Sequence, residues 1–510
     1  MPKPSHTHCR RWGLRLAALA LGLALPAAVE VALWLTGVGA PAAYAPRQLV
    51  QIVEDGQIAG EFEVPTDPHY VEEPGEDGRR WMRTGPGFRG EEGVAFHGPG
   101  IMRDVRFLPE PEPGVARYFL LGGSAALGLA PTTPAAPRWW TTTLAVVDPA
   151  LEPERIQAEL TRTPGGMNVL REEASITGQV RARLEAAGRR VEVINAAVVA
   201  QDSTDVVREA RELLSLQPEG LLLYLGNNEE LALEQLLREA ERPVLTRVGG
   251  VLGRLRTYTL LRHALRPPAA AAPRRSGGPL WTVGEHVMAG WVAAGRPLLD
   301  DGRPADLAYQ ALVGRFRHNM EQVVREAGAG GVRVYLVPCA PHLTYQPMFM
   351  DMGETLDAAA RDRSRALILG ARQAAAAEDR DAALARARAA VEADPLRTEA
   401  WFVLGAALDA AGRRDEAIAA LERSFDLDLV HSRTLPEYSR IAAELCADGR
   451  CAAADTHARM VAAARAQGLA LYHRFWGDHE HLTPEGCAWV GAIFSELILA
   501  EPDPTAGGAR

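Results

Sequence analysis

Three short segments, far apart in the sequence, carry residue types that together could cleave an ester. Ser124 follows two glycines, and a serine on a glycine-rich turn can be exposed as a nucleophile. Asp478 and His481 are three residues apart, so one loop can present an imidazole that takes the serine proton and a carboxylate that orients the imidazole. Asn228 carries a side-chain amide that can donate to an oxyanion. Each segment alone is also typical of a turn, a surface loop or a helix cap, so the hypothesis depends on their combination.

Short apolar segments, which predict strands, precede Ser124 and Asn228 in the sequence. Four such segments alternate with amphipathic helical patterns, at 115–121, 191–195, 220–225 and 332–338. One of the helical patterns begins after the candidate caps Ser203 and Thr204. This alternation predicts a parallel sheet covered by helices on both faces, with ligands bound beyond the carboxyl ends of the strands. Ser124 and Asn228 would both lie at that edge.

At these residues the chain resembles the SGNH (GDSL-like) hydrolase superfamily. Ser124 matches the nucleophile block, written here Gly-Gly-Ser-Ala, Gly226-x-Asn228-Glu229 matches the third block, and Asp478-x-x-His481 matches the last. The resemblance covers about 115–345 and 432–500. It implies an α/β fold, a three-layer sandwich with a flavodoxin-like parallel sheet, and a Ser-His-Asp triad.

The resemblance also implies an oxyanion hole made by the N–H groups of Ser124 and Ala200 and by the side chain of Asn228. The segment 191–203 resembles the second block, where the donor is usually glycine. Alanine keeps the backbone N–H, but a positive φ at Ala200 would be strained. Gly123 would let substrate approach the backbone, and Arg433 would hold a substrate carboxylate or phosphate unless it forms a surface ion pair.

The N-terminus predicts export and a membrane anchor. Residues 1–15 are basic, with no acidic residue, and 16–35 form an apolar stretch of 20 residues interrupted by Glu30. Such a length crosses a hydrocarbon core of about 30 Å, and the basic flank stays in the cytoplasm. We therefore expect a single span over 16–36 in the inner (plasma) membrane, with the remainder on the periplasmic side. The alternative is a cleaved signal peptide, for which Ala43-Tyr44-Ala45 is the candidate site.

The remainder of the chain divides into segments of different texture. Residues 355–431 resemble a tetratricopeptide repeat, because Trp401, Leu404, Gly405 and Leu408 have the spacing of a 34-residue helical repeat. This insert either binds a protein partner or fills space.

The whole chain is expected to divide into six segments. They are a tail (1–15), an anchor (16–36), an extension of short strands and turns (46–113), the first part of the hydrolase domain (114–350, with a cap or surface insertion at 230–310), the helical insert (355–431) and the second part of the hydrolase domain with the Asp/His loop (432–500).

Composition excludes several other functions. The 55 basic residues against 65 acidic ones give a net charge of −10, which argues against a nucleic-acid partner. No phosphate-binding loop or dinucleotide fingerprint is present, so we expect no cofactor. No metal is expected either, although His473, His479 and His481 cluster near Asp478 and leave that alternative open. Cys446 and Cys451 are close enough in sequence to pair in an oxidising compartment, which the sequence leaves open.

The leading prediction is a serine esterase of the cell envelope that hydrolyses acyl or acetyl esters, with an acylated envelope polysaccharide or lipid as substrate. An O-acetyltransferase that passes the acyl group to a sugar hydroxyl would use the same triad and is the first alternative. A catalytically weak scaffold that binds carbohydrate and protein is the second. The alanine at position 200 is the best support for the scaffold.

Overall fold

The computed structural model describes most of the chain from residue 68 onward and short stretches before it. The described residues are 24, 27–33, 35–36, 47–54, 57–65, 68–86, 88–90, 102–131, 167–229, 257, 307–345, 358–427, 434–478 and 480–503. The greater part of the segment 230–310 and much of 16–36 therefore lie outside the described residues, so the predicted cap and anchor are not described. Among the residues that are, no helix is long and apolar enough to cross a membrane.

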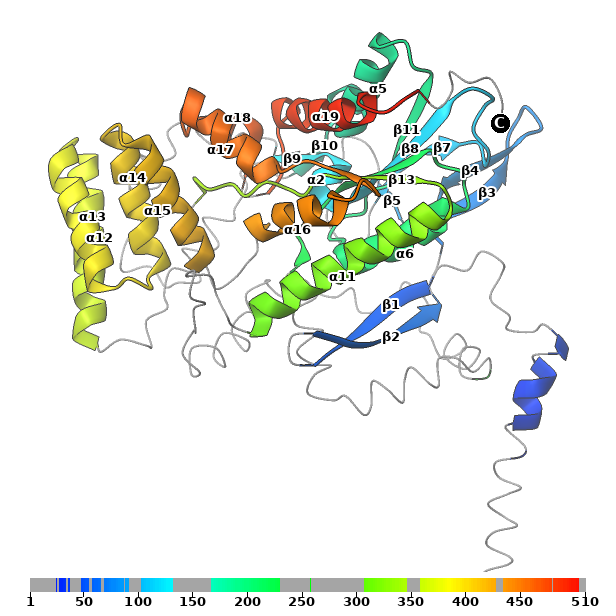
Figure 1. Ribbon diagram of the computed structural model, residues 1–510, viewed down its shortest axis with the longest axis horizontal. Coiled ribbons are helices and arrows are strands. Elements are labelled where there is room, and N and C mark those ends of the chain that lie inside the picture. Colours follow the sequence, from blue (N-terminus) through cyan, green and yellow to red (C-terminus); the bar gives the residue numbers. More distant parts are fainter. Residues whose placement is uncertain are drawn as a thin grey trace, which may run out of the picture.

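A parallel five-stranded sheet forms the centre of the molecule, as predicted (Figure 1). Its strands are β8 (Ala116–Gly122), β11 (Val191–Asn195), β12 (Gly220–Tyr224), β13 (Arg333–Leu336) and β14 (Ala452–Ala453). The spatial order is β11-β8-β12-β13-β14, and every neighbouring pair is parallel. The two-residue edge strand β14 was not predicted, because so short a segment has no periodicity to detect.

The strand order marks where a ligand should bind. Numbered along the chain, the five strands lie in the order 2-1-3-4-5, so successive connections leave in opposite directions between β8 and β12. In doubly wound sheets the crevice at this switch point, beyond the carboxyl ends of the strands, is the binding site. Ser124 follows β8 and Asn228 follows β12, which places both candidates at the switch point.

Helices cover both faces of the sheet, which explains why its strands are almost uniformly apolar. All residues of β8 and β12 are buried. In Figure 1, α5 (Ile176–Ala186) and α19 (Pro484–Leu499) lie above the sheet, and α6 (Ser203–Leu214) and α11 (Leu307–Ala329) lie below it. The short helix α16 (Pro436–Cys446) packs against α11.

The cap of α6 differs from the prediction by one residue. Asp202, rather than Ser203 or Thr204, is the N-cap, and its carboxylate accepts hydrogen bonds from the N–H groups of Thr204 and Asp205. An ionised carboxylate is a strong acceptor at a helix N-terminus, where it also faces the positive end of the helix dipole. Ser203 is thereby left for a different partner, described below.

Short strands lie on both sides of β8 in the sequence. A hairpin of β1 (Arg47–Glu54) and β2 (Gln57–Pro65) lies against α6 and α11 (Figure 1). A second sheet contains β3 (Tyr70–Pro74), β4 (Arg80–Thr84) and β7 (Arg106–Phe107), and two small pairs are formed by β5 (Arg89–Gly90) with β6 (Met102–Arg103) and by β9 (Leu129–Pro131) with β10 (Met167–Val169). Buried His69 and Glu212, joined at 2.9 Å, tie this region to α6.

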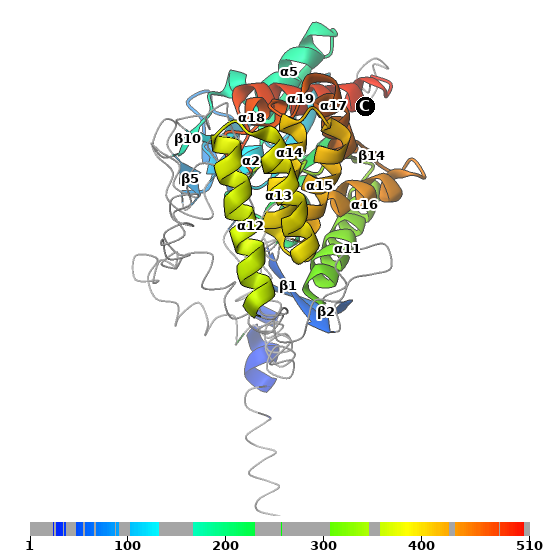
Figure 2. The same ribbon diagram turned by 90° about the vertical axis from the view of Figure 1, so that its left-hand side faces the viewer.

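Four helices that pack consecutively project from one side of the sheet domain (Figures 1 and 2). They are α12 (Ala358–Ala376), α13 (Arg380–Ala393), α14 (Thr398–Ala410) and α15 (Arg414–Leu427). Gly405 allows α14 and α15 to approach closely, because a Cβ there would lie 2.7 Å from Cγ of Leu421. After α16 and β14, the helices α17 (Thr456–Gln467) and α18 (Leu471–Phe475) lead back to the sheet.

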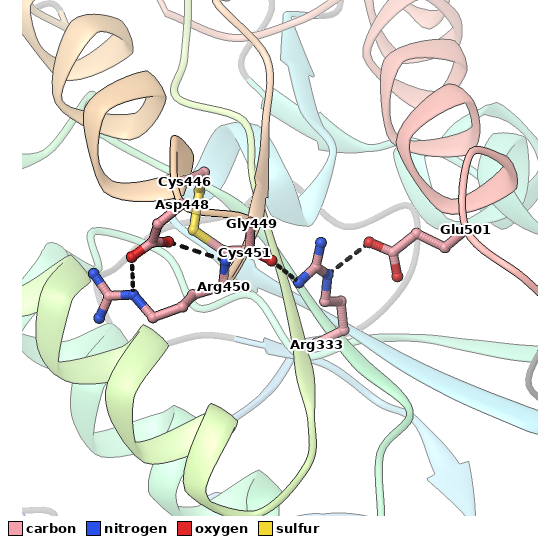
Figure 3. Close-up of a disulfide and its surroundings, with 7 residues drawn as sticks. All are labelled: Arg333, Cys446, Asp448, Gly449, Arg450, Cys451 and Glu501. Carbon is pink, nitrogen blue, oxygen red and sulfur yellow. Dashed lines mark hydrogen bonds and ion pairs between the residues drawn. A yellow bond between two sulfur atoms is a disulfide. The ribbon is translucent and has the colours of Figure 1, made fainter.

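A disulfide joins Cys446 to Cys451, which answers the question that the sequence left open (Figure 3). It closes the loop that connects α16 to the edge strand β14. Within that loop the carbonyl of Gly449 accepts a hydrogen bond from Arg333, whose guanidinium also pairs with Glu501 at 2.6 Å. The covalent bond and the two polar contacts connect this edge of the sheet to Glu501, two residues after α19.

Candidate active site

The turn after β8 places Ser124 at the switch point between β8 and β12. Gly122 has a φ of 144°, and a Cβ there would lie 1.9 Å from the carbonyl oxygen of Tyr224. Gly123 is the N-cap of the four-residue helix α2 (Ser124–Leu127), and a Cβ on it would lie 2.1 Å from Nδ2 of Asn228. Only glycine fits at either position. Gly123 therefore brings the Asn228 amide against the turn that carries the serine.

Ser124, His481 and Asp478 form a continuous hydrogen-bonded chain. The Oγ of Ser124 lies 2.9 Å from Nε2 of His481, and Nδ1 of His481 lies 2.8 Å from Oδ2 of Asp478. Because a carboxylate only accepts, the neutral imidazole carries its hydrogen on Nδ1 and offers the Nε2 lone pair to the serine hydroxyl. All three residues are nearly buried, between 5% and 8% exposed. This geometry can deprotonate Ser124.

Asp478 is fixed by its own loop. Its Oδ1 accepts hydrogen bonds from the backbone N–H groups of Glu480, at 2.9 Å, and of His481, at 2.7 Å. The N–H of Gly477 donates to the carbonyl of His481 at 2.8 Å, which closes the loop at its base. The three-residue spacing thus serves two purposes, because one carboxylate orients the backbone with one oxygen and the imidazole with the other.

His342 is a site residue that the sequence did not single out. It lies after β13, is fully buried, and its Nδ1–H donates to the backbone carbonyl of Asp478 at 2.7 Å. Its ring stacks on Tyr472 and Trp476, with centroids 5.7 Å and 5.6 Å away. His342 therefore anchors the Asp/His loop to the sheet. Its place at the carboxyl end of a predicted strand was the available signal, but the histidine had no sequence partner at metal-ligand or catalytic spacing.

The loops that carry Ala200 and Asn228 lie side by side. The Nδ2 of Asn228 donates to the carbonyl of Gln201 at 3.1 Å, and its amide group retains a second N–H. Ala200 has a φ of 63°, the left-handed conformation that was expected to be strained for alanine. The backbone at position 200 thus has the left-handed conformation that glycine adopts without strain. Arg433 lies outside the described residues.

A buried ion pair holds these two loops together. The carboxylate of Glu229 accepts from the N–H of Ser203 at 2.8 Å and from its hydroxyl at 2.6 Å. Arg315, on α11, lies 3.1 Å from the same carboxylate and also donates to the carbonyl of Glu229. Arg315 and Glu229 are each only 1% exposed. Glu229 directly follows Asn228 and Ser203 follows Ala200 by three positions, so this pair fixes the spacing of the two candidate oxyanion donors.

Glu480, which the sequence pattern did not single out, places a second carboxylate beside His481. Its Oε1 lies 3.6 Å from Nε2 of His481, and its Oε2 accepts from Nδ2 of Asn227 at 3.1 Å. Burial alone would lower the pKa of His481, but the charges of Asp478 and Glu480, together with the hydrogen bond to Asp478, raise it to about 9. The site therefore favours the imidazolium, which is the form that appears once the serine proton has been taken.

Nothing among the described residues gathers three or more His, Cys, Asp or Glu side chains in a way that could hold a metal ion. Burial lowers the pKa of His473 to about 4, so this neighbour of His342 is neutral at physiological pH. His479 lies outside the described residues. The groups that face one another in the described site are a serine, an imidazole and two carboxylates.

Comparisons with protein-family models, with curated proteins and with solved structures found no match to this chain.

Proposed function

We propose that this protein is a serine hydrolase that cleaves ester bonds through Ser124, His481 and Asp478. The observation that carries the proposal is the unbroken hydrogen-bonded chain from Ser124 Oγ through His481 to Asp478, at 2.9 and 2.8 Å. It lies at the switch point of a doubly wound sheet, where such folds bind their ligands. The same arrangement supports assignment of the sheet domain to the SGNH type. The consecutive packing of α12–α15 supports assignment of these helices to the tetratricopeptide type.

The reaction proceeds in two halves. Ser124 Oγ attacks the ester carbonyl as His481 Nε2 takes its proton, and the imidazolium then protonates the departing alcohol to leave an acyl-enzyme. Water, activated by the same nitrogen, releases the acid. Asp478 keeps His481 in the required tautomer and stabilises the imidazolium.

Three donors would stabilise the oxyanion that forms in each half. They are the N–H groups of Ser124 and Ala200 and the Nδ2 group of Asn228, and each such donor is worth about 3 kcal/mol in enzymes that use them. The left-handed backbone at Ala200 and the contact of Asn228 with Gly123 support this assignment. Because the loops are crosslinked by Glu229 and Arg315, the donors need not reorganise during the reaction.

We propose that the protein acts outside the cytoplasm. The disulfide between Cys446 and Cys451 is typical of proteins that fold in an oxidising compartment. The basic and apolar N-terminal sequence supports the same location, with 16–36 as the proposed anchor. An envelope ester, on a polysaccharide or a lipid, is the corresponding substrate class. Transfer of the acyl group to a sugar hydroxyl is the second candidate, because the acceptor in the second half need not be water.

Labelling with a fluorophosphonate probe tests the proposed nucleophile. Such probes react with activated serines, and we expect stoichiometric phosphonylation of the fragment 46–510 at Ser124, located by peptide mass spectrometry. Ser124→Ala should abolish the labelling. If folded wild-type protein does not react, the serine is not activated, and the scaffold alternative replaces the proposed function.

The activity should have an alkaline pH profile, because only neutral His481 can accept the serine proton. With a pKa of about 9, the neutral fraction grows as the pH rises toward that value. We expect kcat/KM to increase about tenfold per pH unit below pH 8 or so and to level off above the pKa. Glu480→Gln removes one of the two negative charges and should move the midpoint to lower pH. Initial rates of p-nitrophenyl acetate hydrolysis, corrected with Ser124→Ala as the blank, would measure both profiles. A wild-type profile that is flat from pH 6 to 9 would contradict this assignment of the electrostatics.

A further inference from the structure

Glu480 is held rigidly at the reactive nitrogen of the proposed triad. Its backbone N–H donates to Asp478 at 2.9 Å, and its Oε2 accepts from Asn227, so both ends of the residue are fixed. Asn227 is only 2% exposed, and its Oδ1 accepts a weak hydrogen bond from the thiol of Cys339 at 3.5 Å. Its amide is thus oriented with Nδ2 toward Glu480. The β12 loop and the Asp/His loop together hold Oε1 3.6 Å from Nε2 of His481.

The proposed triad does not by itself require this carboxylate. Asp478 already fixes the tautomer of His481 and balances the charge of the imidazolium. A second carboxylate whose side chain is only 16% exposed costs desolvation energy, and beside a serine nucleophile it also repels anionic substrates. A carboxylate only accepts hydrogen bonds, and each of its oxygens can accept more than one. The substrate group that would benefit from Glu480 is therefore a hydrogen-bond donor.

The position of Oε1 identifies which part of the substrate carries that donor. In the proposed reaction Nε2 contacts first the serine hydroxyl and then the oxygen of the departing alcohol, because it protonates that oxygen. A group that reaches Oε1, 3.6 Å from Nε2, must therefore be attached close to the alcohol oxygen. A hydroxyl on the neighbouring carbon meets this condition, and acyl chains, which lie on the other side of the carbonyl, do not.

We propose that Glu480 binds a hydroxyl group adjacent to the ester oxygen, so that the alcohol portion of the substrate is a polyol such as a sugar ring or glycerol. This inference rests on the proposed function. The Ser124 Oγ–carbon bond forms while the serine proton moves to Nε2, and that proton then passes to the alcohol oxygen as the carbon–oxygen bond of the ester breaks. The adjacent hydroxyl keeps its own proton and donates to Oε1 throughout. Water then hydrolyses the acyl-enzyme and its proton returns through Nε2 to Ser124.

Two acetates that differ in one donor test the inference. The alcohol portion of 2-hydroxyethyl acetate has an adjacent hydroxyl, whereas that of 2-methoxyethyl acetate has an ether oxygen without a proton. Hydrogen bonds to charged groups make about a ten- to hundredfold difference, and we expect wild-type kcat/KM to favour the hydroxyl ester by that factor. Glu480→Gln, which retains a neutral acceptor, should reduce the preference to a few-fold, and Glu480→Ala should reduce it to about one.

Controls separate this effect from others. The ratio of the two esters does not depend on the ionisation of His481, because both are cleaved through the same imidazole. Glu485→Gln removes an exposed carboxylate that pairs with Arg474 at the start of α19 and should leave the ratio unchanged. Glu480→Gln is expected to react with the fluorophosphonate probe, which would show that this variant is folded, so the test does not depend on the alanine variant.

Three outcomes would overturn the inference. Hydrolysis of both esters by wild type at equal kcat/KM would exclude a hydroxyl contact while leaving the proposed function intact. A stronger preference for acetylcholine than for 2-hydroxyethyl acetate would show that positive charge, and not a hydroxyl group, is selected. Absence of both ester hydrolysis and probe labelling in folded wild type would remove the proposed function and this inference with it.

Discussion

Replacing Ser124 with alanine is expected to lower kcat/KM for acetate ester hydrolysis by about 10⁴- to 10⁶-fold, the loss found when one member of such a triad is removed. The Ser124 hydroxyl lies 2.9 Å from Nε2 of His481, so its proton is already directed at a base that can take it as the oxygen attacks. The residual rate would come from direct attack of water on the ester, with the oxyanion still stabilised by its donors. The measurement is the initial rate with p-nitrophenyl acetate at a pH above the midpoint of the wild-type profile.

A matched control is Ser215→Ala, which removes a hydroxyl that donates to the carbonyl of Glu212 at the far end of α6. This variant should keep wild-type kcat/KM within about twofold, since it touches neither the triad nor the candidate oxyanion loops. If Ser124→Ala retained a tenth or more of the activity, the nucleophile would be a different group. The proposed acyl-enzyme at Ser124 would then be excluded.

Replacing Arg315 with methionine is expected to lower the free energy of unfolding by about 3–5 kcal/mol, the cost of breaking a buried ion pair by removing one partner. The Glu229 carboxylate would remain almost fully buried, with the donors of Ser203 but without the guanidinium. Since Glu229 crosslinks the loops of Ala200 and Asn228, kcat should also fall while the Ser124–His481 contact is unaffected. Urea denaturation followed by circular dichroism gives the free energy by linear extrapolation.

Arg317→Met is the control on the same helix. Arg317 pairs with Glu444, but both side chains are at least one-third exposed, and exposed pairs contribute about 0–1 kcal/mol. Adding Glu229→Gln to Arg315→Met should recover part of the lost stability, because the unpaired charge is then removed. A loss for Arg315→Met no larger than that for Arg317→Met would mean that the buried pair does not hold the loops.

The residue types and local patterns of the sequence determined the parallel sheet and the candidates on its edge. Strands such as 220–225 are continuous apolar runs because helices cover both of their faces, and this pattern survives without any knowledge of the fold. Asp478 and His481 were found because their contact is local, three residues apart. Ser124 and Asn228 were found because each directly follows a strand, and parallel strands end at one edge.

Only the tertiary structure decided which distant groups meet. The contacts of His342 with Asp478, of Glu480 with Asn227 and of Arg315 with Glu229 join residues that are 86 to 253 positions apart. No periodicity records such pairs, because each depends on the order of the strands and on the packing of α11 beneath them. The sequence left the disulfide between Cys446 and Cys451 open for a related reason. Proximity in sequence permits the bond, but only the folded backbone brings the two Cα atoms to 4.8 Å, a distance that a disulfide can span. The sequence determines which residues can act as nucleophile, base or donor. The residues that surround them are determined by contacts that form only when the chain folds.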